Sequence, residues 1–271
     1  GRDLVELGIV DRVEVLRGPA STLYGSKALA GVVAFWTPEA AGASWSGDER
    51  RTAWALRAGA ASRDDSHWFS ARMAARSEDA RLTALVALGR REGHETENSA
   101  RDPDDAANPA DFRSDSALAK FGFDAGTAGR WTATLEQGRG ERQTDVQSQL
   151  FGPGRFATTY ALLADDRFRR DRISLATEWD SLGPVGPVRA LAYRQSSRSE
   201  QWSDQFRLPD RATPFASRRE RGFIFEQVST GLELTAQWRG ELGGFEHWQV
   251  FGLDLARHDF QGLRDGLETN L

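Results

Sequence analysis

Along most of the chain, apolar and polar residues alternate one by one in segments of about ten residues. In the clearest segment, residues 228–239, one face consists of Val228, Thr230, Leu232, Leu234, Ala236 and Trp238, and the intervening positions are mostly polar. Residues 172–179 and 117–124 repeat the pattern, and an aromatic residue closes each apolar stripe. Since successive side chains of a strand point to opposite faces, the pattern predicts strands with one apolar and one polar face.

The alternating segments are joined by connections of two kinds. We predict strands near residues 52–61, 66–75, 81–91, 116–125, 130–139, 170–180, 187–196, 224–239 and 247–258. The predicted short connections are residues 76–80, 126–129, 181–186 and 240–246, and the long polar ones are 92–115, 140–169 and 197–223. Short turns at one end and long loops at the other are typical of a bacterial outer-membrane barrel.

Two other architectures were weighed against this barrel. A soluble barrel or sandwich also alternates, but it does not need such a two-sided loop asymmetry, although the short first connection, residues 62–65, departs from the pattern. The longest nearly apolar run, residues 28–36, is far shorter than the roughly 20 residues that a membrane-spanning helix needs. The sequence therefore excludes a helical membrane protein and favours an all-β, transmembrane antiparallel β-barrel.

The first forty residues follow a different pattern. A strand is predicted over residues 10–16, ending at Arg17-Gly18-Pro19, and a short helix over residues 20–24, closed by Gly25. A second strand is predicted over residues 32–37, where Pro38 stops it. We therefore divide the chain into residues 1–40 and the barrel strands of residues 41–271.

Composition and charge exclude several classes of function. The net charge is −5, and basic residues are scattered among acidic ones, which argues against nucleic-acid binding. The chain has no cysteine, so it offers neither a disulfide framework nor a thiolate metal site. It shows no signal peptide and begins with Gly1, so we expect the true amino terminus to be missing.

The segment from Asp11 to Thr37 resembles the distal plug motif of TonB-dependent outer-membrane receptors. It combines Val-Glu-Val, Arg-Gly-Pro, Tyr-Gly and Gly-Val-Val-Ala-Phe at fixed spacing, while Lys27 and Ala30 depart from the residues usual in the family. The resemblance implies a barrel of about 22 strands around a plug. The chain would then carry the distal part of the plug in residues 1–40 and about nine strands of an unclosed barrel, with the plug remnant against the concave side.

The resemblance makes the motif residues structural parts of a gate. Glu14 and Arg17 are expected to pair with inward charges of the barrel, because an unpaired buried charge is costly. Gly18 and Gly25 are expected to supply unusual backbone angles and Gly31 a close approach between chain segments. Pro19 and Tyr24 complete the motif.

The ligand is less defined by the sequence. Residues 28–37, 251–257 and 262–266 resemble the haem and haemoglobin receptor branch. His94, at the start of a predicted outer loop, is the histidine placed best to meet a ligand, although solvated loop histidines are common. Arg139 and Arg142 begin an arginine-rich loop, and further clusters occur at residues 167–170 and 218–221. These arginines could bind haem propionates or an anionic ferric siderophore, or equally the phosphates of lipopolysaccharide.

The implied function is TonB-dependent uptake of an iron-containing ligand across the bacterial outer membrane, with haem or haemoglobin favoured and a ferric siderophore as the alternative. The expected partners are the TonB–ExbB–ExbD complex, through a segment before Gly1, and outer-membrane lipid and lipopolysaccharide. A passive channel is disfavoured because a porin has no such plug. We expect no enzyme, no intrinsic cofactor and no resident metal, since the sequence has no carboxylate pair, nucleophile motif or metal-ligand spacing.

Overall fold

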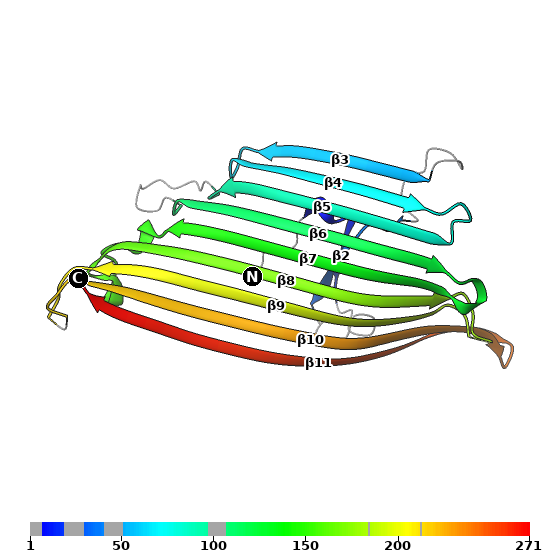
Figure 1. Cartoon of the computed structure of the whole chain (residues 1–271). Coiled ribbons are helices and arrows are strands. Elements are labelled where there is room, and N and C mark those ends of the chain that lie inside the picture. Colours follow the sequence, from blue (N-terminus) through cyan, green and yellow to red (C-terminus); the bar gives the residue numbers. More distant parts are fainter. Residues whose placement is uncertain (1–6, 19–29, 41–50, 97–106, 184, 212) are drawn as a thin grey trace.

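The computed structural model describes residues 7–18, 30–40, 51–96, 107–183, 185–211 and 213–271. Nine of its strands form one antiparallel sheet in the order of the sequence, from β3 to β11 (Figure 1). Their bounds are β3 (Thr52–Ala61), β4 (Ser66–Arg76), β5 (Leu82–His94), β6 (Ala110–Asp124), β7 (Arg130–Asp145), β8 (Thr159–Trp179), β9 (Val188–Arg207), β10 (Ser217–Leu242) and β11 (Phe245–Asn270). The predicted all-β meander and its nine-stranded, unclosed sheet are confirmed.

A separate two-stranded sheet pairs β1 (Arg12–Arg17) with β2 (Gly31–Trp36). The predicted first strand thus begins two residues later than expected, and the second begins one residue earlier. The predicted helix over residues 20–24, with Pro19, Tyr24 and Gly25, lies outside the described residues. The predicted division at residue 40 borders the undescribed residues 41–50 and stays a prediction.

The strands lengthen along the chain, from 10 residues in β3 to 26 in β11. The long connections predicted at 92–115, 140–169 and 197–223 were therefore wrong in extent, because only residues 95–109, 146–158 and 208–216 lie between the strands. The polar residues that were predicted as loops instead extend the strands and continue their hydrogen-bonded pairing. Arg113, for example, faces Glu92 and Glu141 across the neighbouring strands, and opposite charges in register stabilise a sheet.

One face of the sheet carries an apolar band, and we call it the outer face. Register pairs within the band include Leu88 with Ala117, Leu135 with Ile173, and Leu232 with Leu255. The larger side chains of this band are exposed. They are Trp54, Leu56, Met73, Val86, Leu88, Phe121, Leu135, Ile173, Leu175, Leu232, Leu234 and Leu253. An exposed apolar band on alternate positions is the surface that a barrel presents to lipid.

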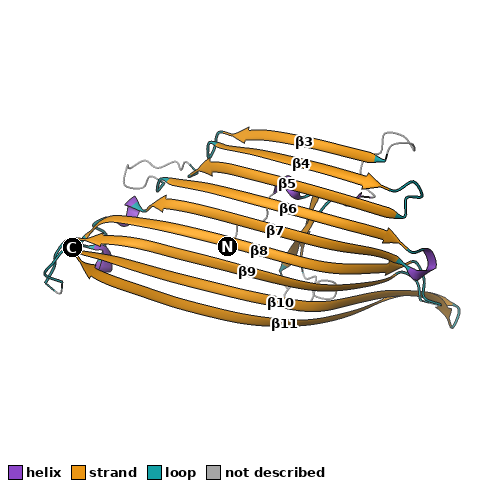
Figure 2. Cartoon of the chain, viewed as in Figure 1, coloured by secondary structure: helices purple, strands orange, loops and turns teal. Residues whose placement is uncertain are grey.

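The opposite, inner face contacts the chain that precedes the barrel strands. Ile9 packs against a cluster of Ala40, Ala74, Leu85, Ala87 and Leu118. The 3-10 helix η1 (Leu7–Ile9) lies against β4, β5 and β6, and Figure 2 shows β1 and β2 on the same side of the curved sheet. The residues around the plug-like motif therefore lie on the polar face, opposite the apolar band.

Two ion pairs join these early residues to the inner face. Arg72 of β4 donates from NH1 to Asp11 Oδ1 at 3.2 Å, and Lys120 of β6 pairs with Glu39. Lys120 is only 6% exposed, so this pair neutralises a buried cation. These charges were not predicted, because sequence alone does not place Glu39 beside Lys120, 81 residues away.

The motif residues have mainly local contacts. Glu14 pairs with Arg12 at 2.9 Å and accepts a hydrogen bond from Trp36 Nε1 at 3.0 Å, so its described partners belong to β1 and β2. Gly18 has φ +105°, which favours glycine. A Cβ on Gly31 would lie 2.5 Å from the main-chain oxygen of Leu16. Gly31 therefore allows the close approach of β1 and β2.

Among the described residues, no helix is long and apolar enough to cross a membrane.

Candidate ligand-binding surface

Strand alternation separates the three residues predicted to bind ligand. His94 ends β5 on the outer face, where its Nδ1 lies 2.7 Å from Asp111 Oδ1. Arg139 of β7 also lies on the outer face, in register with Arg169. Arg142 has the opposite parity and lies on the inner face, in register with Asp166. The three residues do not form one site.

The same alternation divides the other arginine clusters. Arg170 lies on the inner face, whereas its neighbour Arg169 lies on the outer face; likewise Arg219 and Arg221 are inner and Arg218 is outer. Each cluster therefore contributes to two different surfaces.

Beyond β5, Glu95 fixes the connection that leads to β6. Its Oε2 accepts the main-chain N–H of Ala110 at 2.8 Å, and this hydrogen bond is the main reason that the pKa of the Glu95 carboxyl is lowered. Arg142 and His94 contribute smaller attractions in the same direction. The base of this connection is thus held by a carboxylate that is ionised at neutral pH.

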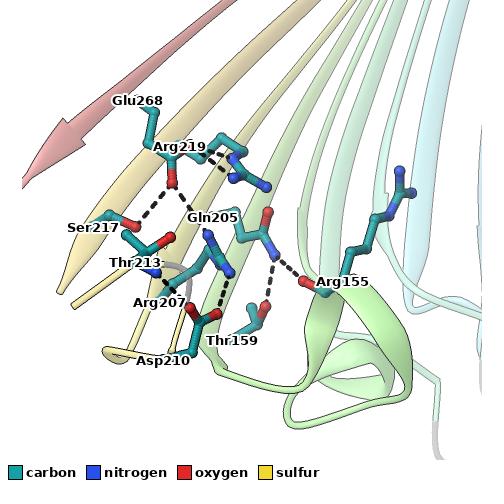
Figure 3. A network of polar contacts seen from close by, with 9 residues as sticks. All are labelled: Arg155, Thr159, Gln205, Arg207, Asp210, Thr213, Ser217, Arg219 and Glu268. Atoms are coloured by element: carbon teal, nitrogen blue, oxygen red, sulfur yellow. Dashed lines mark hydrogen bonds and ion pairs between the residues drawn. The ribbon is translucent and has the colours of Figure 1, made fainter. Parts of the chain in front are cut away.

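A network of polar contacts closes the inner face at the ends of β8 to β11 (Figure 3). Glu268 of β11 is its centre: Arg219 donates to Oε2 at 2.7 Å, and Arg207 and Ser217 donate to Oε1 at 3.2 Å each. The carboxylate therefore ties three side chains from β9 and β10 to β11.

The network continues into the connections. Arg207 also donates to Asp210 at 2.9 Å, and Asp210 accepts the main-chain N–H of Thr213 at 2.7 Å. Gln205, 2% exposed, donates to Thr159 Oγ1 at 2.6 Å and to the main-chain oxygen of Arg155 at 3.2 Å. The ends of the long strands are thereby held together with η6 (Gly154–Phe156).

Next to this network lie arginines without carboxylate partners. Arg221 of β10 is within electrostatic range of Arg155, Arg219 and Arg264, and Glu268 opposes this charge. Among the described residues, none of Arg155, Arg221 and Arg264 has a carboxylate within ion-pair distance. Figure 3 shows the Arg155 side chain extending away from the network. The inner face therefore concentrates positive charge here.

Exposed phenylalanines border these arginines. Phe223 faces Arg264 across β10 and β11 and is 45% exposed, while Phe225 and Phe260 are 38% and 62% exposed. The rings of Phe225 and Phe260 lie 6.0 Å apart. Below them, His258 Nδ1 lies 2.8 Å from Ser229 Oγ. We call Arg221, Arg264, Phe223, Phe225 and Phe260 the inner ligand surface.

Small residues leave space on this face. A Cβ added to Gly262 of β11, which is in register with Phe225, would have no heavy atom within 4 Å. Exposed aromatic rings beside cations, with open space in front of them, suit an anion that also carries apolar or aromatic groups.

This surface was predictable from the sequence only in part. The arginines at 219 and 221 were noticed as part of a cluster, but Phe223, Phe225, Phe260 and Arg264 were missed. Residues 259–270 were not predicted as strand, so the face of the sheet on which Phe260 and Arg264 lie could not be predicted.

A hollow of about 510 Å³, separate from the inner ligand surface, lies near the ends of β5 to β10. Its lining is rich in carboxylates, with Asp111, Asp145, Asp165, Asp204 and Glu220, and also includes His94 and Trp202. Among the described residues, no group of three or more His, Asp or Glu is arranged to hold a metal ion. Because its lining is negatively charged, the hollow does not suit an anionic ligand.

Comparisons with known proteins agree with the two parts of the chain. Residues 1–32 match the family model described as TonB-dependent Receptor Plug Domain. No curated protein matches the chain. Among solved structures, the ferric yersiniabactin uptake receptor FyuA from Yersinia pestis is similar in fold, with a TM-score of 0.52 and 14% identity over 94% of this chain and 49% of that one.

A second solved structure, the siderophore receptor PiuA from Acinetobacter baumannii, gives a TM-score of 0.46 and 9% identity over 93% of this chain and 52% of that one. The chain thus spans about half the length of the solved receptors that it matches. At these identities, the likeness concerns the fold.

Proposed function

We propose that the chain, whose first residues match the plug model and whose strands have the fold of a receptor barrel, takes part in the uptake of a ferric chelate across the bacterial outer membrane. The plug residues would respond to TonB and its ExbB–ExbD complex, and the strands would form part of the barrel wall. The proposed role is transport and not catalysis.

The inner ligand surface is the observation that carries this proposal. It lies on the polar face, beyond the contacts made by Ile9, and combines Arg221 and Arg264 with exposed phenylalanine rings. An anionic chelate can accept charge-assisted hydrogen bonds from the guanidinium groups and lay its apolar groups on the rings. Arg142, also on the inner face, is proposed as a further contact.

A ferric siderophore is proposed in preference to haem. FyuA is described as a receptor for ferric yersiniabactin and PiuA as a siderophore receptor. Haem iron is commonly held by imidazole. Of the histidines in the described strands, only His258 lies on the inner face near the inner ligand surface, and it contacts Ser229. Haem and haemoglobin therefore enter the test as competing ligands.

The test uses the complete receptor whose reading frame contains this chain, expressed in an iron-starved strain that lacks its own receptors. Growth is measured on ferric siderophores, haem and haemoglobin, with and without TonB. We expect TonB-dependent growth on a ferric siderophore. Growth on haem alone would show that the transported ligand is haem and not a siderophore. Uptake without TonB would favour the passive channel and contradict the proposal.

A pair of variants tests the inner ligand surface itself. Arg221→Gln combined with Arg264→Gln should weaken binding of the transported ferric chelate by at least about tenfold, since each loses a charge-assisted hydrogen bond. Arg218→Gln removes an arginine from the same strand on the outer face and should bind as the parent does. Equal affinities for all three proteins would place the ligand elsewhere.

A further inference from the structure

Arg155 approaches the inner ligand surface from a connection and not from a strand. It lies in η6, between β7 and β8, and is exposed. Its guanidinium carbon lies 4.7 Å from the centre of the Phe156 ring, and the same guanidinium is within electrostatic range of Arg221. The attraction between a guanidinium and a ring face favours this direction of the side chain. The connection therefore brings a further cation to the side of Arg221.

A buried glutamine of β9 holds the backbone at this position. Gln205 donates from Nε2 to the main-chain oxygen of Arg155 at 3.2 Å and to Thr159 Oγ1 at 2.6 Å (Figure 3). Gln205 is 2% exposed, and Thr159 is fully buried. One amide group thereby joins the turn that carries Arg155 to the first residue of β8.

The other hydrogen bonds of the connection act at neighbouring residues. The main-chain N–H of Ala157 donates to the oxygen of Gly154 at 3.2 Å and closes the turn locally. The main-chain N–H of Leu208 donates to the oxygen of Thr158 at 2.8 Å and ties the end of the connection to the end of β9. The bond from Gln205 is the one that acts on the residue carrying the charge.

Stability alone does not account for a glutamine at position 205. The two hydrogen bonds that Gln205 donates are accompanied by a buried Oε1 atom that has no hydrogen-bond partner among the described residues. An unpaired buried acceptor is destabilising, and an apolar side chain of the same length would avoid it. Departures from such local rules are expected at functional sites. The position that Gln205 gives to Arg155 supplies a functional reason for the glutamine.

We propose that Gln205 positions Arg155 so that its guanidinium binds the anionic part of the transported ferric chelate together with Arg221 and Arg264. A guanidinium offers five N–H donors, and an anion that bridges the arginines of the connection and the strands offsets their mutual repulsion. Arg155 is then a contact residue and Gln205 a positioning residue. The inference rests on the proposed function and adds to the inner ligand surface a residue supplied by the β7–β8 connection.

The first measurement tests the positioning and needs no chelate. A nitroxide spin label is attached at Arg155→Cys in the complete receptor, since this chain has no cysteine and any cysteine outside it can be replaced. The spectrum should narrow in a Gln205→Met background, because methionine keeps the length of glutamine but has no N–H to donate. Gln237→Met, on the inner face near the other end of β10, should leave the spectrum unchanged.

The second measurement tests the contact. It is the affinity of the complete receptor for the ferric siderophore that supports its growth, loaded with radioactive iron. Arg155→Gln should bind this chelate about tenfold more weakly and Gln205→Met about threefold, since the second variant keeps the charge and loses only its position. In the Arg155→Gln background, Gln205→Met should have no further effect. A purely structural glutamine would weaken binding by the same factor in both backgrounds.

Three results would overturn the inference: an unchanged spin-label spectrum in Gln205→Met, parental affinity of Arg155→Gln, or additive effects of the two substitutions. Heat-dependent gel mobility checks folding, and Arg155 is exposed, so Arg155→Gln tests the contact even if Gln205→Met does not fold. Growth assays separate the two proposals. Absence of TonB-dependent growth on any ferric siderophore would refute the proposed function, whereas a transporting receptor in which Arg155→Gln binds as the parent does would refute this inference alone.

Discussion

At the scale of single residues, charge matters here according to the face on which it lies. Arg169 and Arg170 are neighbours in the chain, yet Arg169 pairs with Asp171 on the outer face and Arg170 pairs with Glu136 on the inner face. The sequence left ligand binding and lipopolysaccharide binding as equal explanations for such clusters. Both explanations remained open because the face on which each arginine lies cannot be assigned until the strand and its register are known.

Glu95 gives a prediction about pH. Its pKa is lowered, first by the hydrogen bond from the Ala110 main chain, so its stabilising contribution is full above the unfolded pKa of roughly 4.3 and is lost as the pH falls through the lower folded value. We therefore expect the Ala110 amide to exchange faster with solvent at about pH 3 than at pH 7, after correction for the intrinsic exchange rate.

The variant Glu95→Gln provides the comparison for this measurement, which uses hydrogen exchange on the complete receptor in detergent. Glutamine still accepts the N–H but has no charge to lose, so the corrected exchange rate at Ala110 should depend less on pH. Glu246→Gln, which alters a carboxylate 81% exposed near the β10–β11 turn, should leave Ala110 unchanged. The same pH dependence in all three proteins would rule out Glu95 as its cause.

At the scale of elements, the two faces of a strand should tolerate charge very differently. Leu234 and Thr235 are adjacent in β10, but Leu234 lies in the apolar band between Ala190 and Leu253, whereas Thr235 is exposed on the inner face. Leu234→Arg should destabilise the folded barrel by roughly 2–4 kcal/mol, the cost of an arginine among lipid tails. Thr235→Arg should cost much less.

Urea titration of the complete receptor folded into lipid vesicles measures both substitutions. The matched positions share a strand, a depth and a replacement residue, so only the face differs. Equal destabilisation by the two variants would contradict the assignment of the outer face.

The inner parts of the strands were predictable from sequence, and their outer ends were not. Within the band, larger apolar residues alternate with small or polar ones, and β3 was predicted with its observed bounds. Beyond the band both faces are polar, as in residues 197–207 of β9, and hydrophobic alternation vanishes. Cross-strand ion pairs such as Arg218 with Asp204 at 2.7 Å continue the sheet there, and partners from other strands cannot be read from one segment.

At the scale of the whole molecule, the early residues and the sheet are linked by few strong contacts. A small apolar cluster around Ile9 and the two pairs Arg72–Asp11 and Lys120–Glu39 join them. In the proposed transport the plug shifts, so its contacts with the barrel must be strong enough to seal the lumen and few enough to release. Of these contacts, we expect the Lys120–Glu39 pair to contribute most to holding the early residues on the sheet, because Lys120 is buried on the inner face.

Glu39→Gln should therefore loosen the plug. It leaves the Lys120 ammonium buried without its carboxylate, but Glu39 is 60% exposed, so we expect a cost of about 1–2 kcal/mol, below that of breaking a fully buried pair. An opening equilibrium that shifts by this amount rises roughly tenfold. In the complete receptor, the variant should admit more of a large antibiotic that the outer membrane normally excludes, and it should show more frequent channel openings in planar bilayers.

Two further variants separate a lock from a general loss of stability. Glu246→Gln breaks an exposed pair with Arg239 and should stay sealed. Combining Glu39→Gln with Lys120→Gln removes the stranded charge, so the double variant should leak less than Glu39→Gln alone, because the remaining amides need no counter-ion. A double variant that leaks as much as Glu39→Gln or more, or a Glu39→Gln receptor as tight as the parent, would show that this pair does not hold the plug. Partial resealing is expected only if Lys120 and Glu39 act on each other across the boundary between plug and barrel.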